Sequence, residues 1–144
     1  AIIEMSDFNI LVGQNNCGKT NFFEAVDLFY NGVPKKVDIN SLKFKHDTSL
    51  EIKVSISFSD GQEGASKMKN EKNKVSILKA IGDSDEITII RSSLNLKKRT
   101  VFVNGTEVNP GTGFDTALND FLPKFALFMK KKQFSDFKYC NNHF

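Results

Sequence analysis

The sequence predicts an α/β fold in which a strand–loop–helix unit is followed by a smaller antiparallel sheet. Three observations support this prediction. A short apolar run at residues 8–12 leads into a glycine-containing loop and then into a helical pattern. From Leu50 onward, apolar and polar residues alternate strictly, as on a half-buried antiparallel strand. Further on, Asn104-Gly105 separates two β-type segments and indicates a tight hairpin.

Length and composition limit the possible classes of protein. The chain of 144 residues is long enough for one domain with a hydrophobic core. Its net charge of +3 is too mild to indicate a dedicated nucleic-acid binder. No apolar run is long enough to cross a bilayer, and two distant cysteines, Cys17 and Cys140, do not form a disulfide pattern. We therefore expect a cytoplasmic protein without a membrane partner.

The first part of the chain, residues 1–33, predicts a strand, a loop and a helix. Residues 8–12 are apolar and end at a glycine, which is typical of a strand buried in a parallel sheet. Residues 20–30 carry an apolar face at helical spacing that would pack on this sheet; its members are Phe22, Phe23, Val26 and Phe29. Gly32 and Pro34 then predict the end of the helix.

The second part, residues 37–109, predicts an antiparallel, lid-like sheet with a surface helix. Residues 50–58 alternate and form the first strand, and residues 86–96 form the second. Residues 64–81 are polar and rich in lysine, with an apolar spacing at Val75, Leu78 and Ile81 that predicts a surface helix ended by Gly82. The hairpin joins residues 100–103 to residues 106–108.

The third part, residues 110–144, predicts a short helix and a returning strand. Phe114, Leu118 and Phe121 have helical spacing, and Pro123 would terminate the helix. Residues 124–129 are interpreted as another buried strand. Because the chain starts at Ala1 and stops at Phe144 without a closing element, we interpret it as a single partial domain of a longer protein.

The strongest functional signal is the loop between the first strand and the first helix. Gly13, Gly18, Lys19 and Thr20 match the phosphate-binding pattern G-x-x-x-x-G-K-[ST] without exception. Glycines let successive backbone N–H groups point at an anion, and the helix that follows adds its positive end. Lys19 would contact the β- and γ-phosphates, and the Thr20 hydroxyl would coordinate Mg²⁺. The motif therefore predicts a site for Mg²⁺ and a nucleoside triphosphate.

The sequence around this loop resembles a particular group of ATPases. Residues 9–26, NILVGQNNCGKTNFFEAV, resemble the phosphate-binding loop of ABC-type ATPase heads of the RecF/SMC-like group. They are most similar to the overcoming-lysogenization-defect (OLD) family of ATP-dependent endonucleases, in which Asn21 and Glu24-Ala25 extend the motif. The alternating strand and the hairpin also resemble the antiparallel lid of such heads. The fold implied is a P-loop NTPase, as the N-terminal lobe of an ABC-type head.

The resemblance implies ATP and Mg²⁺ as cofactors and an ATPase that dimerises through its heads and acts with DNA. The nucleotide-binding residues would be Gly13, Gln14, Asn15, Asn16, Cys17, Gly18, Lys19, Thr20 and Asn21, with Lys19 catalytic and Thr20 the ligand of Mg²⁺. Relatives in the OLD family carry a Toprim nuclease domain far downstream, which this sequence lacks.

Two motifs of such heads are not convincingly present. Residues 59–62, SDGQ, resemble the signature motif but follow a strand directly, so a turn is the better interpretation. Residues 83–86, DSDE, precede an apolar run instead of ending one, so we interpret them as a loop and not as the acidic motif. Gln133 is a candidate ligand near Mg²⁺, with a plain surface glutamine as the alternative. We therefore expect this chain to hold ATP without hydrolysing it.

Other residues have a common structural explanation beside a functional one. Cys17 is either a redox-sensitive thiol or a small filler residue of the loop. Two lysine runs would either grip a phosphate backbone or form a solvated face; they are Lys67, Lys69, Lys72 and Lys74, and residues 130–132. His46 and His143 are isolated and give no metal-site signal. A nucleotide-responsive dimerisation module with little turnover, and a non-functional remnant, remain as alternatives to an ATPase.

Overall fold

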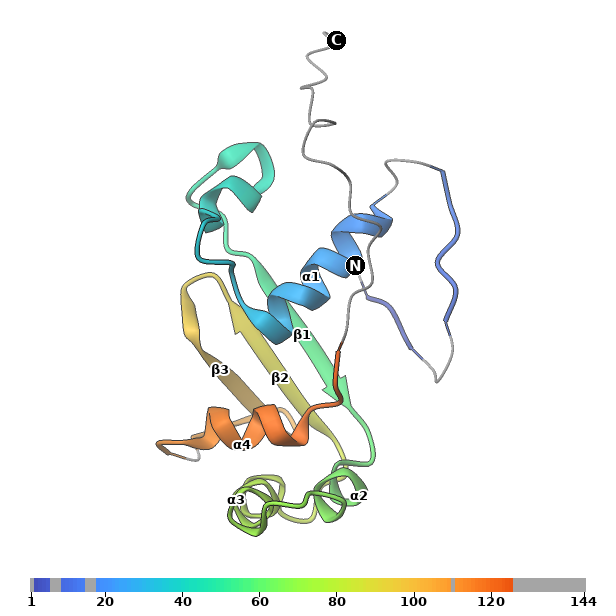
Figure 1. The fold of residues 1–144 in the computed structure, drawn as a ribbon, viewed down its shortest axis with the longest axis vertical. Helices are drawn as coiled ribbons and strands as arrows, with labels where there is room; N and C mark the ends of the chain where they lie inside the picture. Colours follow the sequence, from blue (N-terminus) through green and yellow to red (C-terminus); the bar gives the residue numbers. More distant parts are fainter. Residues whose placement is uncertain (1, 6–8, 15–17, 110, 126–144) are drawn as a thin grey trace, which may run out of the picture.

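The computed structural model describes residues 2–5, 9–14, 18–109 and 111–125 (Figure 1). Its helices and strands follow one another in an order that begins with the helix after the glycine-containing loop. They are α1 (Lys19–Asn31), the short 3-10 helices η1 (Ile39–Leu42) and η2 (Phe44–His46), β1 (Lys53–Phe58), α2 (Gly61–Ser66), α3 (Glu71–Ile81), β2 (Ile87–Ser92), β3 (Asn95–Val103), β4 (Thr106–Val108) and α4 (Phe114–Phe121). None of the helices within these ranges is long and apolar enough to span a bilayer.

The four strands form one antiparallel sheet in the order β1-β2-β3-β4. The register aligns apolar side chains into a row that crosses all four strands; the row is Ile56, Ile89, Val101 and Val108. Because side chains alternate between the two faces of a sheet, this row lies on one face. The same face therefore forms the floor of the hydrophobic core.

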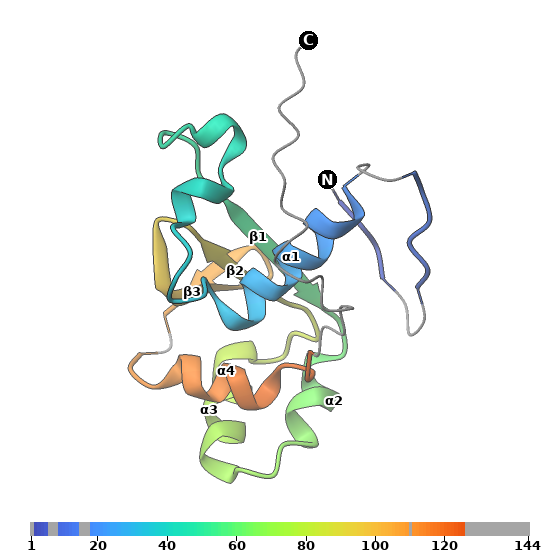
Figure 2. The same ribbon diagram turned by 45° about the horizontal axis from the view of Figure 1, so that its top comes forward.

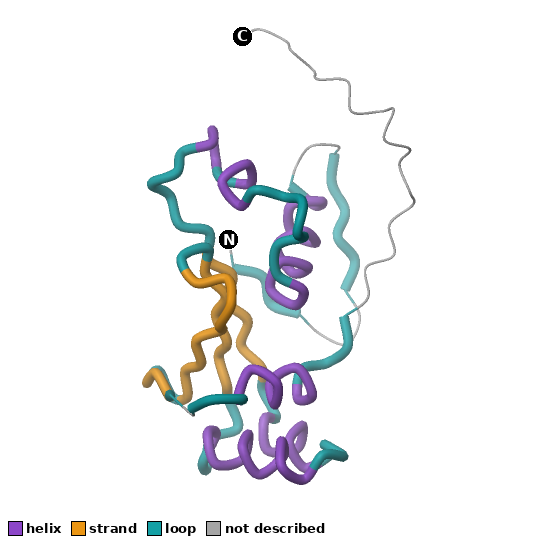
Figure 3. The backbone as a smooth tube through the Cα atoms, turned by 60° about the vertical axis from the view of Figure 1, so that its left-hand side comes forward, coloured by secondary structure: helices purple, strands orange, loops and turns teal. Residues whose placement is uncertain are grey.

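Helices from three parts of the chain complete the core above that face. Phe29 of α1, Ile77 and Ile81 of α3 and Leu118 of α4 are essentially inaccessible to solvent and belong to one cluster with the sheet residues. Figures 2 and 3 both show α4 between the sheet and α3, whereas Figure 1 shows α1 crossing in front of β1. The Phe29 ring lies 6.5 Å from that of Phe58, the last residue of β1. Helix α1 and the α2–α3–α4 group thus cover the same face of the sheet, and both α1 and α4 contact Phe58.

Several of the predicted elements are confirmed. Helix α1 ends where Gly32 predicts, with the Gly32 N–H donating to the Leu28 carbonyl at 2.9 Å. The hairpin at Asn104-Gly105 joins β3 to β4, and both residues have positive φ, 50° and 74°, as this two-residue turn requires. Helix α4 ends at Phe121, two residues before Pro123.

The predicted strand at residues 8–12 is wrong for the residues described. Residues 9–12 have no regular secondary structure, and Ile10 and Val12 are 68% and 86% exposed; Phe8 lies outside the described residues. The physical reason is that a parallel strand needs a neighbouring strand to pair with and a covered face. In the described part of the chain, the sheet is entirely antiparallel and does not include this segment.

Four further elements differ from the prediction, in whole or in part. The surface helix expected at 64–81 is two helices, α2 and α3, and its buried residues include Ile77 and Ile81, whereas Val75 is 61% exposed. The strand expected at 86–96 reverses at residues 93–94, so that it supplies both β2 and the start of β3. The strand expected from Leu50 begins at Lys53. Of the strand expected at 124–129, residues 124–125 are irregular and the others lie outside the described residues.

Candidate phosphate-binding site

The candidate site is at the N-terminal end of α1, where the glycine-containing loop meets the helix. Gly18 is the N-cap and has a left-handed backbone, φ 89° and ψ 4°, which a residue with a Cβ atom adopts only with strain. The first N–H groups of a helix have no acceptor within the helix. Here the N-cap residue supplies no side-chain acceptor for them, and the first turn contains no acidic residue. The helix end therefore keeps the positive electrostatic character that suits an anion.

Lys19 folds back over the loop. Its Nζ donates to the backbone carbonyl oxygens of Gly13 and of Gln14, each at 2.6 Å (residues 13–14 precede the undescribed part of the loop). The ammonium group is thus held close to the backbone of the motif by oxygen acceptors. A phosphate group offers oxygens of the same hydrogen-bonding type with more negative charge, so it would compete well for these donors.

The other predicted site residues fall into two groups. Gly13, Gln14, Thr20 and Asn21 are exposed at the mouth of the loop and in the first turn of α1, where a ligand would reach them. Three residues of the motif lie outside the described residues, as does Gln133; the three are Asn15, Asn16 and Cys17. Among the described residues of the motif, Lys19 therefore lies against the start of the loop, at Gly13 and Gln14.

The acidic segment at residues 83–86 lies in a loop, as the sequence predicts, whereas the turn predicted at residues 59–62 is wrong in part, because its second half begins helix α2. Ser59 and Asp60 connect β1 to α2, with Asp60 as the N-cap, and Gly61 and Gln62 are the first residues of that helix. The Gly61 N–H donates to the Asp85 carbonyl at 2.7 Å. Ser84 lies in a loop and is buried, with its hydroxyl donating to the Asn104 side chain at 3.0 Å. Both segments thus serve to join the α2–α3 unit to the sheet.

The first lysine run lies on α3 and the turn before it. Lys67 pairs with Glu63, and Lys74 lies 3.8 Å from Glu71, while Lys69 and Lys72 are exposed. Exposed pairs of this kind are typical of a solvated surface and contribute little to stability. The second run, residues 130–132, lies outside the described residues.

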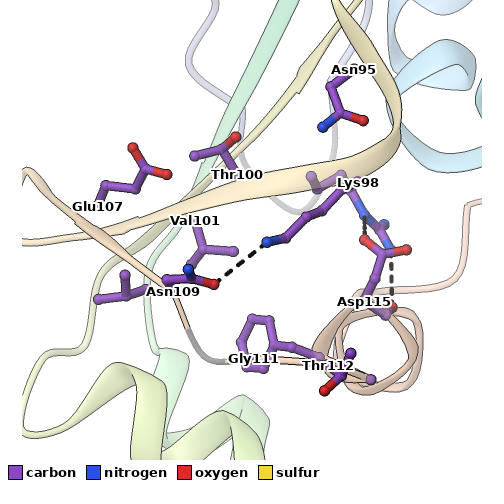
Figure 4. Close-up of a pocket in the computed structure, with 13 residues that line it drawn as sticks. Asn95, Lys98, Thr100, Val101, Glu107, Asn109, Gly111, Thr112 and Asp115 are labelled. Atoms are coloured by element: carbon purple, nitrogen blue, oxygen red, sulfur yellow. Dashed lines mark hydrogen bonds and ion pairs between the residues drawn. The ribbon is translucent and has the colours of Figure 1, made fainter.

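A separate cavity of about 500 Å³ lies between β3, β4 and the start of α4 (Figure 4). It shares no residue with the predicted loop. Its charged lining residues balance, because Lys98 and Arg99 face Glu107 and Asp115. Lys98 donates to the Asn109 side chain at 3.4 Å, and Arg99 pairs with Asp115 at 2.8 Å. This balance does not favour either an anion or a cation.

Metal ligands and shifted pKa values do not add a second site. Within the described ranges, no group of three or more His, Cys, Asp and Glu side chains is arranged to hold a metal ion. On α1, burial raises the pKa of Tyr30 above its ordinary value, and the nearby charge of Arg99 partly opposes this. That tyrosine lies at the C-terminal end of the helix, far along the chain from Lys19, and stacks on Phe125 with the ring centroids 5.1 Å apart.

Comparison with known proteins adds evidence on the fold. No protein-family model matches the chain, and no curated protein matches it. Among solved structures, one reported with the structural biochemistry of ATP-driven dimerisation and DNA-stimulated activation of SMC ATPases is similar, with a TM-score of 0.50 and 19% identity. The alignment covers 85% of this chain and 69% of the other. At this identity the likeness concerns the fold alone: the chain has an α/β fold similar to that of an SMC ATPase.

Proposed function

We propose that the chain binds ATP with Mg²⁺ at residues 13–21, as part of an ABC-type ATPase head. The observation that carries the proposal is the position of Lys19, whose Nζ closes over the Gly13 and Gln14 carbonyls at the uncapped N-terminal end of α1. The complete G-x-x-x-x-G-K-[ST] motif and the likeness in fold to an SMC ATPase support it.

Each residue has a distinct role in this proposal. Lys19 exchanges the Gly13 and Gln14 carbonyls for phosphate oxygens and offsets their negative charge. The backbone N–H groups at the start of α1 orient the phosphates. Thr20, which is exposed in the first turn, offers its hydroxyl to Mg²⁺. When bound, Mg²⁺-ATP supplies the transferable phosphoryl group.

The proposal extends to the protein in which such a head acts. The motif at residues 9–26 supports an OLD-like machine that acts on DNA, with ATP-dependent pairing of two heads. A nucleotide-responsive dimerisation module with little turnover is the second candidate. The flanking coding sequence would separate the two candidates. An apolar strand that ends in Asp-Glu there would favour the first candidate, and its absence from an intact reading frame would favour the second. No such strand is convincingly present in these 144 residues. For this chain we accordingly propose binding without steady hydrolysis.

The test compares ATP affinity, measured by calorimetry with Mg²⁺ present, in the wild type, Lys19→Ala and Lys43→Ala. Lys43 is the matched control, because its Nζ also donates to a backbone carbonyl, that of Thr48 at 2.8 Å. We expect Lys19→Ala to weaken binding on the order of 100-fold, since it removes charge-assisted hydrogen bonds to phosphate. Lys43→Ala should bind as the wild type does.

Two outcomes would contradict the proposal. Equal ATP affinity of the wild type and Lys19→Ala would remove the site from this loop. Sustained phosphate release by the purified chain, lost in Lys19→Ala, would show that the chain carries its own catalytic acidic group and would replace binding alone with hydrolysis.

A further inference from the structure

Two buried arginines lie on the core-facing side of the sheet, each on a different strand. Arg91 on β2 is 8% exposed and Arg99 on β3 is 3% exposed. Their positions follow the alternation of the strands, since Arg91 shares a face with Ile87 and Ile89, and Arg99 with Val101 and Val103. A charged side chain on this face is costly unless it is hydrogen-bonded, so each must have a structural purpose.

Arg91 bonds the C-terminal end of α1. Its Nε donates to the Phe29 carbonyl at 2.8 Å, and its Nη1 donates to the Leu96 carbonyl of β3, also at 2.8 Å. One guanidinium thus joins the last turn of α1 to the sheet at the place where β2 and β3 meet. Helix α1 is the helix whose first turn carries Lys19 and Thr20.

The electrostatics of this contact are favourable. The last carbonyl groups of a helix have no N–H donor within the helix and carry partial negative charge, which a cation complements. Burial and the neighbouring charge of Arg99 lower the pKa of Arg91 from its ordinary value, while Asp115 opposes them. An arginine keeps its proton in proteins, so the charge persists at the helix end.

Arg99 makes the corresponding contacts with another helix. Its Nε donates to the Asp115 carboxylate at 2.8 Å, and its Nη2 donates to the Asp115 carbonyl and to the Asn119 side chain. Both partners belong to α4. Among the described residues, Arg99 has no hydrogen bond to α1 and its Nη1 has no partner. The hydrogen bonds of Arg91 therefore hold α1 and those of Arg99 hold α4, while the charge of Arg99 also lies near Tyr30 of α1.

We propose that Arg91 is a positioning residue for the nucleotide site: it anchors the C-terminal end of α1 to the sheet, and the rigid helix holds the phosphate-binding turn in place at its other end. This inference rests on the proposed binding of ATP at the start of α1. The carbonyl of Phe29 is ten residues along the helix from Lys19, a distance of about 15 Å at 1.5 Å per residue. A change of tilt at the anchored end moves the binding end directly.

The test measures ATP affinity and amide hydrogen exchange in the wild type, Arg91→Met, Arg91→Lys and the control Arg99→Met. Methionine keeps much of the apolar volume without the donors. All measurements are made at a temperature at which circular dichroism shows each variant to be folded. We expect Arg91→Met to bind ATP about tenfold more weakly and Arg91→Lys to recover part of this loss, because an ammonium still reaches a carbonyl. Without nucleotide, exchange in Arg91→Met should accelerate within residues 19–31.

Arg99→Met should instead accelerate exchange within α4 and leave ATP affinity within about twofold of the wild type. If Arg91→Met does not fold, Arg91→Lys and Arg99→Lys form the comparison, and only the first should lose affinity. Wild-type affinity in a folded Arg91 variant, or an equal loss in the Arg99 variant, would overturn the role of Arg91. Failure of the wild type to bind ATP would overturn the proposed function itself, a distinct result.

Discussion

The two ends of α1 differ in almost every physical respect. At the N-terminal end, Thr20 and Asn21 are exposed and the N-cap residue makes no side-chain hydrogen bond to the helix. At the C-terminal end, Leu28 and Phe29 are buried and Arg91 bonds the Phe29 carbonyl. A helix end that must accept a ligand cannot also be closed by its own protein. The contacts that stabilise this helix are therefore concentrated at its C-terminal end, and the N-terminal end stays available to a ligand.

The largest expected effect is on the free energy of unfolding, when the buried C-terminal end of α1 is altered. Phe29→Ala should lower the free energy of unfolding by about 3–5 kcal/mol, because Phe29 is fully buried and its removal leaves a cavity. Phe23→Ala on the same helix is the matched control. Its side chain is 38% exposed, so we expect a cost of less than about 1 kcal/mol. Urea denaturation measures both, and equal costs would contradict the asymmetry between the two ends of α1.

A smaller effect is expected at the open end, and on binding instead of folding. Thr20→Ala should reduce the gain in ATP affinity that Mg²⁺ provides by about tenfold, since the variant lacks the hydroxyl ligand. Thr20→Ser retains the hydroxyl and should behave as the wild type. Unfolding free energies of both variants should stay within about 0.5 kcal/mol of the wild type, because Thr20 is exposed. Calorimetry with and without Mg²⁺ measures the ATP affinity of each variant. If Mg²⁺ raises the affinity of Thr20→Ala as much as that of the wild type, Thr20 is not a ligand of Mg²⁺.

The smallest effect sharpens the comparison with a helix that has no proposed ligand. At the start of α3, the Asn70 side chain accepts a hydrogen bond from the Asn73 N–H at 3.2 Å, which is the cap that α1 lacks. Asn70→Ala should cost about 1 kcal/mol of stability, and Asn70→Asp should cost less, because it keeps an acceptor. Thermal unfolding measures the difference. ATP affinity should not change, and a change would mean that α3 also contributes to the site.

Prediction from the sequence succeeds where a local rule decides the structure. The spacing of Phe22, Val26 and Phe29 and the glycine at 32 identify α1, and Asn104-Gly105 identifies the turn between β3 and β4. These features depend on neighbours a few residues away. The motif at Gly13 to Thr20 is equally local, because its pattern of residue types lies within eight consecutive positions of the sequence.

Prediction fails where the environment decides. The apolar segment at residues 9–12 resembles a buried strand, yet it is exposed and outside the sheet, since pairing depends on a partner. The reversal at residues 93–94 is not predicted, because Ser93-Leu94 carries no glycine or asparagine. The burial of Arg91 and Arg99 is also not predicted, because charged residues are usually exposed. The signal that could have identified them is their spacing, because each arginine is an even number of residues from the buried apolar residues of its own strand.

By itself, then, the sequence determined the phosphate-binding motif, the helix that follows it and the hairpin turn, all of which arise from short-range backbone and spacing rules. Only the tertiary structure decided which face of the sheet is covered, which charged residues are buried and how α1 is attached. The physical reason is that burial and hydrogen bonding join residues such as Arg91 and Phe29, whose positions along the chain are 62 residues apart. No local pattern encodes that contact, although it holds the helix that begins at Lys19.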